Sequence, residues 1–289
     1  MALQDTLYAK ENRRLWKRQT GEGVDLVFLL LLLTLLGVGL VMLYSASSAQ
    51  SEYDTGYTQS TRYLQKQGLC AIIGLVAMVI ISRIPPEFWL KWAWVLYGVS
   101  ILLLLSVLVF GQSVNGARRW INIGGLQFQP SEIAKFTLIV LFAKLTRDFG
   151  RKARLFSRGV LGFSAALLGI LVPLALEKHL SAIMLMGMVA VVMMFVAGTH
   201  PKWLLAGAAA AVLFVLIYIT FMGYAGDRVT AWLHPEKDPG DTGYQILQSL
   251  YAIGSGGLFG LGFGKSRQKY LYLPFQYNDY IFAICCEEL

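Results

Sequence analysis

Apolar runs separated by short polar connections dominate the chain. Crossing the roughly 30 Å hydrocarbon layer of a bilayer takes about 20 helical residues. Runs of approximately this length fall near residues 24–46, 68–82, 89–110, 131–146, 159–176, 180–198 and 202–222. An eighth run begins at Asp279 and is cut off after about ten residues, which is too few to span. This pattern predicts an all-α polytopic membrane protein with seven spans and part of an eighth, whose C-terminal part is missing.

The composition supports a bilayer as the solvent for most of the chain. Hydrophobic residues make up 56% of the 289 residues and charged residues 15%, against about 25% charged in an average soluble domain. Lys and Arg concentrate in the N-terminal tail and in the connection over 144–158, which share one side if the spans alternate. Because basic residues favour the cytoplasm, we expect a cytoplasmic tail over 1–22 and a single membrane domain over 23–289. The net charge of +8 then suits anionic lipid at the inner leaflet and requires no nucleic acid.

One connection on the outer side, residues 223–278, is too long to be a simple link in a helical bundle. Its stretch GYQILQSLYAIG places Ile246, Leu247 and Leu250 at near-helical spacing, which predicts an amphipathic helix lying on or dipping into the outer membrane surface. The glycine-rich run 254–266 does not fit a phosphate-binding P-loop, because Phe259 stands where the first glycine is required. We therefore interpret these glycines as tight turns and close helix contacts.

The outer connection before the fourth run carries a second group of polar residues. Pro130 and Ser131 mark a helix start, with Ser131 as the expected N-cap and Glu132 in the first turn, where the helix dipole favours an acid. In a structural reading, Glu132 pairs with Lys135 and Arg119 is a surface anchor. We favour a functional reading, because ionisable groups inside a span are costly. In that reading Arg119 and Lys135 bind a phosphate-bearing ligand.

Two further polar stretches interrupt the apolar pattern. Glu177 to Ser181 separates the fifth and sixth runs and is either a polar turn or part of the lining of the same outer cavity. The stretch HPEKDPGDTG holds the carboxylates of Glu236, Asp238 and Asp241. Asp238 is the best candidate for chemistry, because the proline after it favours an extended backbone, whereas Asp241 has a turn role and Glu236 is a solvated acid. The scattered histidines lack the spacing of a zinc site, so no metal ligand is assigned.

Three segments resemble, in order and spacing, the signature segments of the SEDS family (shape, elongation, division and sporulation), the FtsW and RodA type. They are NGARRWINIGGLQFQPSEIAK, RVTAWLHPEKDPGDTGYQILQS and GFGKSRQKYLYLPFQYNDYIFAICCEEL. The last is nearer the division and sporulation branch than the elongation branch. The resemblance covers essentially the whole chain. It implies ten spans in the full protein, and a peptidoglycan glycosyltransferase that polymerises lipid II at the outer face of the bacterial cytoplasmic membrane.

The resemblance also implies roles for individual residues. The family's essential aspartate falls on Asp238, its arginine before tryptophan on Arg119, and its Pro-Ser/Ala-Glu segment on Pro130–Lys135. Within the matching segments, the substrate-binding candidates are Arg119, Ser131, Glu132, Lys135, Gln248, Ser249 and Asp279. The implied partners are a class B penicillin-binding transpeptidase and other division or elongation proteins.

The implied reaction makes two demands that these residues meet. A sugar hydroxyl of one lipid-linked disaccharide attacks the anomeric carbon of a glycan held by a lipid pyrophosphate, with inversion, so a base such as Asp238 must take the hydroxyl proton. The leaving pyrophosphate needs positive charge, which Arg119, Lys135 or a divalent cation, Mg²⁺ or Mn²⁺, could supply. No cofactor is assigned beyond that alternative.

The chain departs from the family pattern at three positions. Phe275 and Tyr277 stand where relatives commonly have Glu and His, and Lys178 stands where they have Pro, so the roles of those family residues cannot be carried over. A lipid II flippase is one rival function, but its polar residues would lie at mid-depth rather than at the outer ends of spans. A non-catalytic scaffold of the division machinery is the other rival, and it would not require Asp238.

Overall fold

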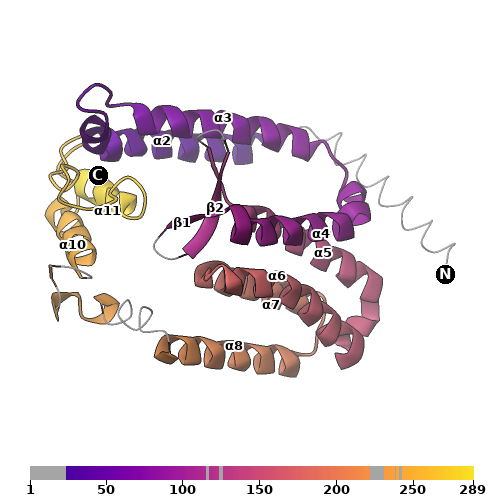
Figure 1. Cartoon of the computed structure of the whole chain (residues 1–289). Helices are drawn as coiled ribbons and strands as arrows, with labels where there is room; N and C mark the ends of the chain where they lie inside the picture. Colours follow the sequence, from indigo (N-terminus) through magenta and orange to yellow (C-terminus); the bar gives the residue numbers. More distant parts are fainter. Residues whose placement is uncertain (1–23, 115–116, 124–125, 222–230, 238, 241–242) are drawn as a thin grey trace. The chain divides into compact units, whose positions relative to one another are not determined.

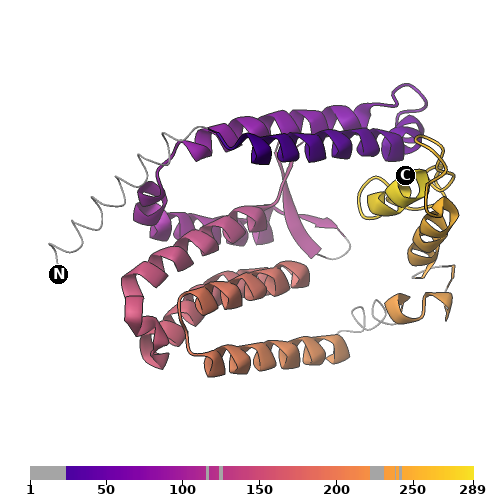
Figure 2. The same ribbon diagram turned by 180° about the vertical axis from the view of Figure 1, so that it is seen from behind.

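The computed structural model describes residues 24–114, 117–123, 126–221, 231–237, 239–240 and 243–289. The chain forms two compact units. We call Met1–Arg83 with Ile219–Leu289 the terminal unit, and Ile84–Tyr218 the central unit. Figures 1 and 2 show their elements from opposite sides.

Two long helices form the frame of the terminal unit. α2 (Leu26–Asp54) begins at the N-cap Asp25, whose carboxylate accepts a hydrogen bond from the Phe28 amide at 3.0 Å. α3 (Arg62–Ser82) returns alongside α2, and both views show the two helices side by side (Figures 1 and 2). Both are long and apolar enough to cross a membrane.

Three further elements of the terminal unit are η3 (Pro235–Lys237), α10 (Tyr244–Gly256) and α11 (Ile281–Glu288). η3 packs on α10. α10 packs on α11, and α11 packs on α2. Their small shared core consists of Ala46, Ala252, Leu273, Ala283 and Ile284. The helix predicted in the long connection is therefore confirmed, and it begins at Tyr244.

The glycines after α10 serve the turns and helix contacts that the sequence predicts. Gly256 lies so close to the backbone of Cys286 in α11 that a side chain there would overlap it. Gly260 lies equally close to the backbone of Glu288 and has a φ of +63°, a left-handed conformation that favours glycine. The interpretation of this run as turns and close contacts is confirmed.

The central unit contains five α-helices among its described residues. They are α4 (Pro86–Phe110), α5 (Pro130–Phe149), α6 (Leu161–Leu176), α7 (Leu180–Val196) and most of α8 (Pro201–Phe221). A 3₁₀-helix η1 (Gly150–Arg154) and a π-helix η2 (Phe156–Val160) connect α5 to α6.

One apolar core joins α4, α5, α6 and α7. Its largest fully buried side chains include Leu104, Leu138, Phe142, Phe163 and Ile170. Two buried hydrogen bonds cross between helices: the Tyr97 hydroxyl donates to the Ala166 carbonyl at 2.7 Å, and the Thr137 hydroxyl donates to the Ser100 hydroxyl at 3.0 Å. Buried polar groups need such partners, so these bonds fix which faces of α4 meet α5 and α6.

A small antiparallel sheet follows α4. Its strands β1 (Gln112–Val114), β2 (Ala117–Ile123) and β3 (Leu126–Phe128) lie in the order β1-β2-β3, with Asn122 opposite Gln127. The all-α prediction is therefore incomplete at this connection. The signal in the sequence is the pair of dipeptides Asn115-Gly116 and Gly124-Gly125, which are typical of two-residue hairpin connections.

Helices occupy all seven predicted apolar runs, and α11 occupies the eighth. By length and composition, four described helices can cross a membrane: Leu26–Asp54, Arg62–Ser82, Pro86–Phe110 and Phe156–Leu176. Two shorter apolar helices cover Leu180–Val196 and Pro201–Leu213. α5 lies outside this set, and its charged residues include Glu132, Lys135 and Lys144. A mostly helical membrane fold is thus established, whereas the full number of spans and the boundary between tail and membrane domain stay predictions.

Candidate functional site

Arg119 connects the sheet of the central unit to the turn between α6 and α7. It lies on β2, and its Nη2 donates to the carbonyl oxygen of Lys178 at 2.6 Å. Lys178 has a φ of +55°, a left-handed conformation that is uncommon for a residue with a side chain. The Nε of Arg119 is buried and has no hydrogen-bond partner among the described residues.

The turn between α6 and α7 buries two titratable side chains beside this arginine. Glu177 is 2% exposed and His179 is 7% exposed. His179 Nε2 lies 3.4 Å from the side-chain nitrogen of Gln129, the residue before α5. Glu177 Oε1 and His179 Nδ1 lack hydrogen-bond partners in the described part of the chain. The sequence left two interpretations open for this stretch, a polar turn or part of the lining of an outer cavity. The structure shows a turn whose Glu177 and His179 side chains are buried, and the lining role stays a prediction.

The first turn of α5 supplies the other side of this region. Glu132 and Lys135 form an ion pair at 2.7 Å, which is the pairing of the structural reading. The functional reading that we favour stays a prediction. The prediction of Ser131 as N-cap is wrong, because the N-cap is Gln129 and Pro130 takes the first helical position, where its fixed φ and missing amide hydrogen suit a helix start. The Ser131 hydroxyl is instead buried within the helix and unpaired among the described residues.

We call Arg119, Gln129, Ser131, Glu132, Lys135, Glu177 and His179 the Arg119 cluster. Four of its buried polar atoms are unpaired within the described structure: Arg119 Nε, Ser131 Oγ, Glu177 Oε1 and His179 Nδ1. Buried polar groups in folded proteins are almost always hydrogen-bonded to protein, water or ligand. The cluster thus combines cationic donors with polar atoms that can bind a polar, anionic group.

Burial changes the protonation of the cluster. It raises the pKa of Glu177 to about 7, although the nearby Arg119 acts in the opposite direction. Burial and the positive charge of Arg119 lower the pKa of His179 to about 4. At pH 7, His179 is therefore neutral and Glu177 is close to half-ionised. The permanent positive charge of the cluster comes from Arg119 and Lys135.

Glu177→Gln should change how stability depends on pH. Since the pKa of Glu177 is about 7 in the folded protein and 4.5 ordinarily, the folded chain keeps a proton that the unfolded chain releases. The stabilisation from this group is full below pH 4.5 and is lost as the pH rises to about 7. The wild-type Tm minus the Glu177→Gln Tm should therefore be larger at pH 5 than at pH 8.

Thermal unfolding of the two purified proteins measures this difference. His179 acts in the opposite direction over the same pH range, but it is common to both proteins and cancels in the comparison. Glu52→Gln, at a half-buried carboxylate in the polar part of α2, is the control and should show no such change between the two pH values. A Tm difference that is the same at pH 5 and pH 8 would contradict the buried, proton-binding state of Glu177.

The remaining predicted site residues lie in the terminal unit. Asp238, the predicted base, and Asp241 lie outside the described residues. Glu236 is exposed and pairs with His234 at 3.2 Å, as expected of a solvated acid. Gln248 and Ser249 lie on α10, where the Ser249 hydroxyl donates to the Ile246 carbonyl at 2.7 Å, and Asp279 is exposed before α11. Their placement next to the Arg119 cluster stays a prediction.

The described residues offer no preformed cage for a divalent cation. No group of three or more His, Cys, Asp or Glu side chains occurs among them in a metal-binding arrangement. Glu132, the carboxylate in the first turn of α5, is already paired with Lys135.

Comparison with known proteins identifies the family. The sequence model of the family FtsW, RodA and SpoVE, described as "Cell cycle protein", matches residues 25–289. The chain belongs to this family. The resemblance to the SEDS proteins and the prediction of an enzyme of the peptidoglycan glycosyltransferase class are thereby confirmed at the level of the family.

Curated relatives agree with this placement. A probable peptidoglycan glycosyltransferase FtsW of Trichlorobacter lovleyi is 37% identical over 270 residues, which cover 92% of this chain and 70% of that protein. Stage V sporulation protein E of Bacillus subtilis is 36% identical over 268 residues, which cover 92% of this chain and 72% of that protein. Both relatives fit the predicted nearness of this SEDS chain to the division and sporulation branch.

Solved structures of SEDS relatives share the fold. The rod shape determining protein RodA of Thermus thermophilus is 28% identical with a TM-score of 0.54, and the match covers 66% of this chain and 60% of RodA. A structure described as "Structural coordination of polymerization and crosslinking by a peptidoglycan synthase complex" is 31% identical with a TM-score of 0.59, covering 86% of this chain and 70% of that one. The match with this chain thus covers well over half the length of both related chains.

Proposed function

We propose that this SEDS chain polymerises lipid II into glycan strands at the outer face of the cytoplasmic membrane, by inverting glycosyl transfer with Asp238 as general base. The observation that carries the proposal is the Arg119 cluster in a member of this family. It presents an arginine whose buried Nε has no partner among the described residues, at the end of the helices where polar side chains gather. A lipid pyrophosphate has the charge and the acceptor oxygens to satisfy such a group.

Arg119 is held ready for an anion by its bond to the Lys178 carbonyl. This bond uses one N–H of Nη2, so the other N–H of Nη2 remains to donate to a phosphate in parallel with a neighbouring nitrogen of the guanidinium. A carbonyl oxygen fixes the arginine without neutralising its charge. The full positive charge is therefore directed to the leaving pyrophosphate as negative charge develops on it.

Lys135 adds a second positive charge in the same cluster. Its ion pair with Glu132 lies at the start of α5, where the helix dipole also favours negative charge. Glu132 is more exposed than Lys135, with side-chain exposures of 59% and 27%. A pyrophosphate oxygen can therefore replace Glu132 as the partner of Lys135. Glu132 then remains solvated, so substrate binding leaves no buried carboxylate without a partner.

Proton transfer completes the reaction. The acceptor hydroxyl of one lipid II loses its proton to Asp238 as its oxygen forms a bond to the anomeric carbon of the donor. The bond from that carbon to the pyrophosphate breaks on the opposite face, and the pyrophosphate leaves with the electron pair. Asp238 then releases the proton to water. Gln248, Ser249 and Asp279 are proposed to orient the sugars and the peptide of the substrate.

The wider assignments follow from the same family. We propose ten spans in the complete protein, with the seven predicted runs and the start of the eighth in this chain. The N-terminus lies in the cytoplasm and the site lies outside. The partner is a class B penicillin-binding transpeptidase, since crosslinking accompanies polymerisation in the related synthase complex.

Polymerisation of purified lipid II tests the proposal. The full-length protein, co-purified with its cognate transpeptidase, should convert fluorescently labelled lipid II into a ladder of glycan strands on a gel. Penicillin should block crosslinking and leave the ladder. If no ladder forms with an intact complex, while labelled lipid II crosses vesicles that contain the protein, the function is lipid transport. If neither occurs and division still requires the protein, it is a scaffold.

A further inference from the structure

Two large apolar side chains project from the tip of the loop after α10. Leu258 is 92% exposed and Phe259 is 90% exposed, more than any other large apolar side chain among the described residues. They lie between Gly257 and Gly260, whose positive φ values turn the chain sharply on both sides. We call Gly257–Gly260 the apolar tip. Exposed apolar surface of this kind marks a contact with another molecule or with lipid.

The apolar and polar parts of α2 show where the hydrocarbon layer of a membrane would begin along the terminal unit. From Leu26 to Tyr44 its residues are apolar apart from one threonine, and this stretch is about 28 Å long, close to the thickness of the hydrocarbon layer. The rest of the helix, from Ser45 to Asp54, is mostly polar and extends about 13 Å further. Ser45 therefore marks the boundary between the apolar layer and the polar headgroup region.

Contacts with α2 show that the chain returns toward this boundary along α11. Near the outer end of α2, the Tyr63 hydroxyl donates to the Asp54 carboxylate at 2.6 Å, and the Tyr63 ring lies 4.3 Å from the ring of Tyr277. Eleven residues later, the Glu288 carboxylate accepts from the Ser45 hydroxyl at 2.8 Å. The chain from Tyr277 through α11 therefore runs from near Asp54 to the level of Ser45.

The apolar tip lies beside this lower end of α11. Gly256, just before the tip, touches the backbone of Cys286. Directly after it, the amides of Leu261 and Gly262 donate to the carbonyls of Glu287 and Glu288 at 2.8 and 3.0 Å. The tip is thus fixed at the level of Ser45, where the apolar layer begins.

The charged groups at the same level point inward and are paired. Glu287 accepts from the hydroxyls of Ser255 and Ser266 and from two backbone amides. Glu288 is fully buried and pairs with Lys269 at 3.0 Å. Since these charges are satisfied inside the terminal unit, the side chains that the tip presents outward are apolar.

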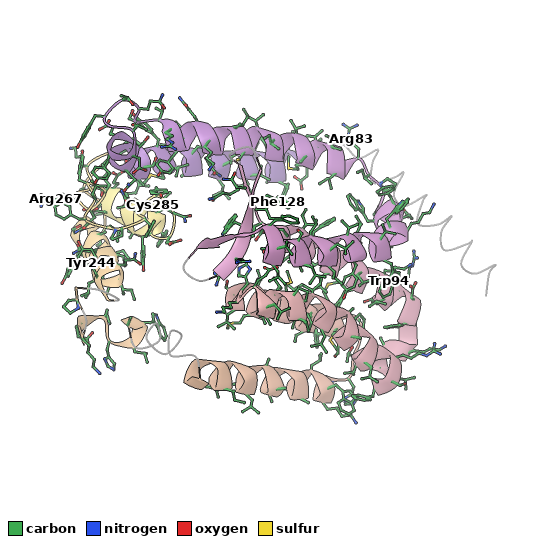
Figure 3. All side chains as sticks on the ribbon, in the orientation of Figure 1. Arg83, Trp94, Phe128, Tyr244, Arg267 and Cys285 are labelled. Atoms are coloured by element: carbon green, nitrogen blue, oxygen red, sulfur yellow. The ribbon has the colours of Figure 1, made fainter. Side chains whose placement is uncertain are left out.

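The chain beyond the tip has the composition of a membrane interface. Lys265 and Arg267 are exposed and share a shallow hollow with Tyr270 and Tyr272. Figure 3 labels Arg267 on this loop and Cys285 on the neighbouring α11. Tyrosine rings and basic side chains gather where lipid headgroups meet water, because the rings suit a mixed environment and the charges attract phosphate.

We propose that the apolar tip is a membrane anchor. Leu258 and Phe259 insert into the acyl chains of the leaflet on the Asp54 side of α2, while Lys265 and Arg267 contact lipid phosphates. The inference depends on α2 spanning the membrane and is independent of glycosyl transfer. Its consequence is that the long loop, which also carries Asp238, is held at the surface where a lipid-linked substrate arrives.

Spin-label accessibility tests the anchor in the full-length protein. Cys70, Cys285 and Cys286 are first replaced by alanine, and a single nitroxide is attached at Phe259→Cys or at its neighbour Leu258→Cys. The protein is reconstituted in nanodiscs of phosphatidylethanolamine and phosphatidylglycerol. Collision rates with oxygen, which concentrates in lipid, are compared with those for a water-soluble nickel complex.

Two matched sites calibrate the measurement. Val38→Cys lies on the exposed side of the apolar stretch of α2, and Tyr57→Cys lies just beyond the polar end of α2. Labels at the tip should favour oxygen, as at Val38. Preference for the nickel complex, as at Tyr57, would overturn the proposal. A second result would also overturn it: labels that collide with the nickel complex in the protein alone and with neither reagent when the transpeptidase is bound. In that case the tip would dock on a protein.

Discussion

Replacing Asp238 with asparagine is expected to abolish glycan polymerisation. Asparagine keeps the size of the side chain and removes its ability to accept a proton, and general base catalysis contributes about 10² to 10⁴ in rate. The family resemblance places the essential carboxylate at this position, between Lys237 and Pro239. The full-length protein with its transpeptidase should therefore form no ladder from labelled lipid II in a time that gives the wild type a complete one.

Glu236→Gln is the matched control for this variant. Glu236 lies two residues earlier, is exposed and pairs only with His234 among the described residues, so its loss should leave the rate unchanged. Full polymerisation by Asp238→Asn would show that the base lies elsewhere, and Asp279 and Glu132 would then be replaced in turn. Loss of activity in both variants would assign the effect to the loop as a whole rather than to one carboxylate.

Arg119→Ala should have the second largest effect, a loss of about 10² to 10³ in the rate of polymerisation, which is typical when one donor to a developing negative charge is removed. Arg119→Lys should restore little of this rate, because an ammonium group cannot make two parallel hydrogen bonds to phosphate and also reach the Lys178 carbonyl. Initial rates of lipid II consumption at saturating substrate measure both variants.

Arg118→Ala separates a catalytic effect from a structural one. Arg118 is the exposed neighbour on the same strand, and its Nη1 donates to the carbonyl of Leu108 at 2.8 Å. It has the same charge and a similar bond to a backbone carbonyl, yet it lies outside the cluster. Equal losses of rate in the Arg118 and Arg119 variants, or a loss of rate that follows a loss of Tm, would contradict a direct role for Arg119.

The helices could be predicted because burial in lipid demands long apolar runs. The run near 89–110 corresponds to α4, Pro86–Phe110, and the run near 180–198 to α7, Leu180–Val196. Polar first turns hid the start of α3 at Arg62, six residues before the predicted run. The sheet after α4 was missed because its strands are three to seven residues long, too short for a periodic pattern to emerge.

The site could be predicted only where its residues are neighbours in sequence. Glu132 and Lys135 are one helical turn apart, so their ion pair follows from spacing alone. Arg119 and Lys178 are 59 positions apart, and their contact depends on a left-handed turn that no sequence pattern announces. The burial of Glu177 and His179 could likewise not be predicted from the sequence, because it depends on how α5 packs against α7.

The bond between Ser45 and Glu288 also sets an order of events during synthesis. The two residues are 243 positions apart, and a ribosome that adds about 5 to 20 residues per second makes the first of them roughly 10 to 50 s before the second. During that interval the polar end of α2 has entered the membrane without its carboxylate partner. The polar end of α2 is thus completed only when a residue 243 positions later has been made.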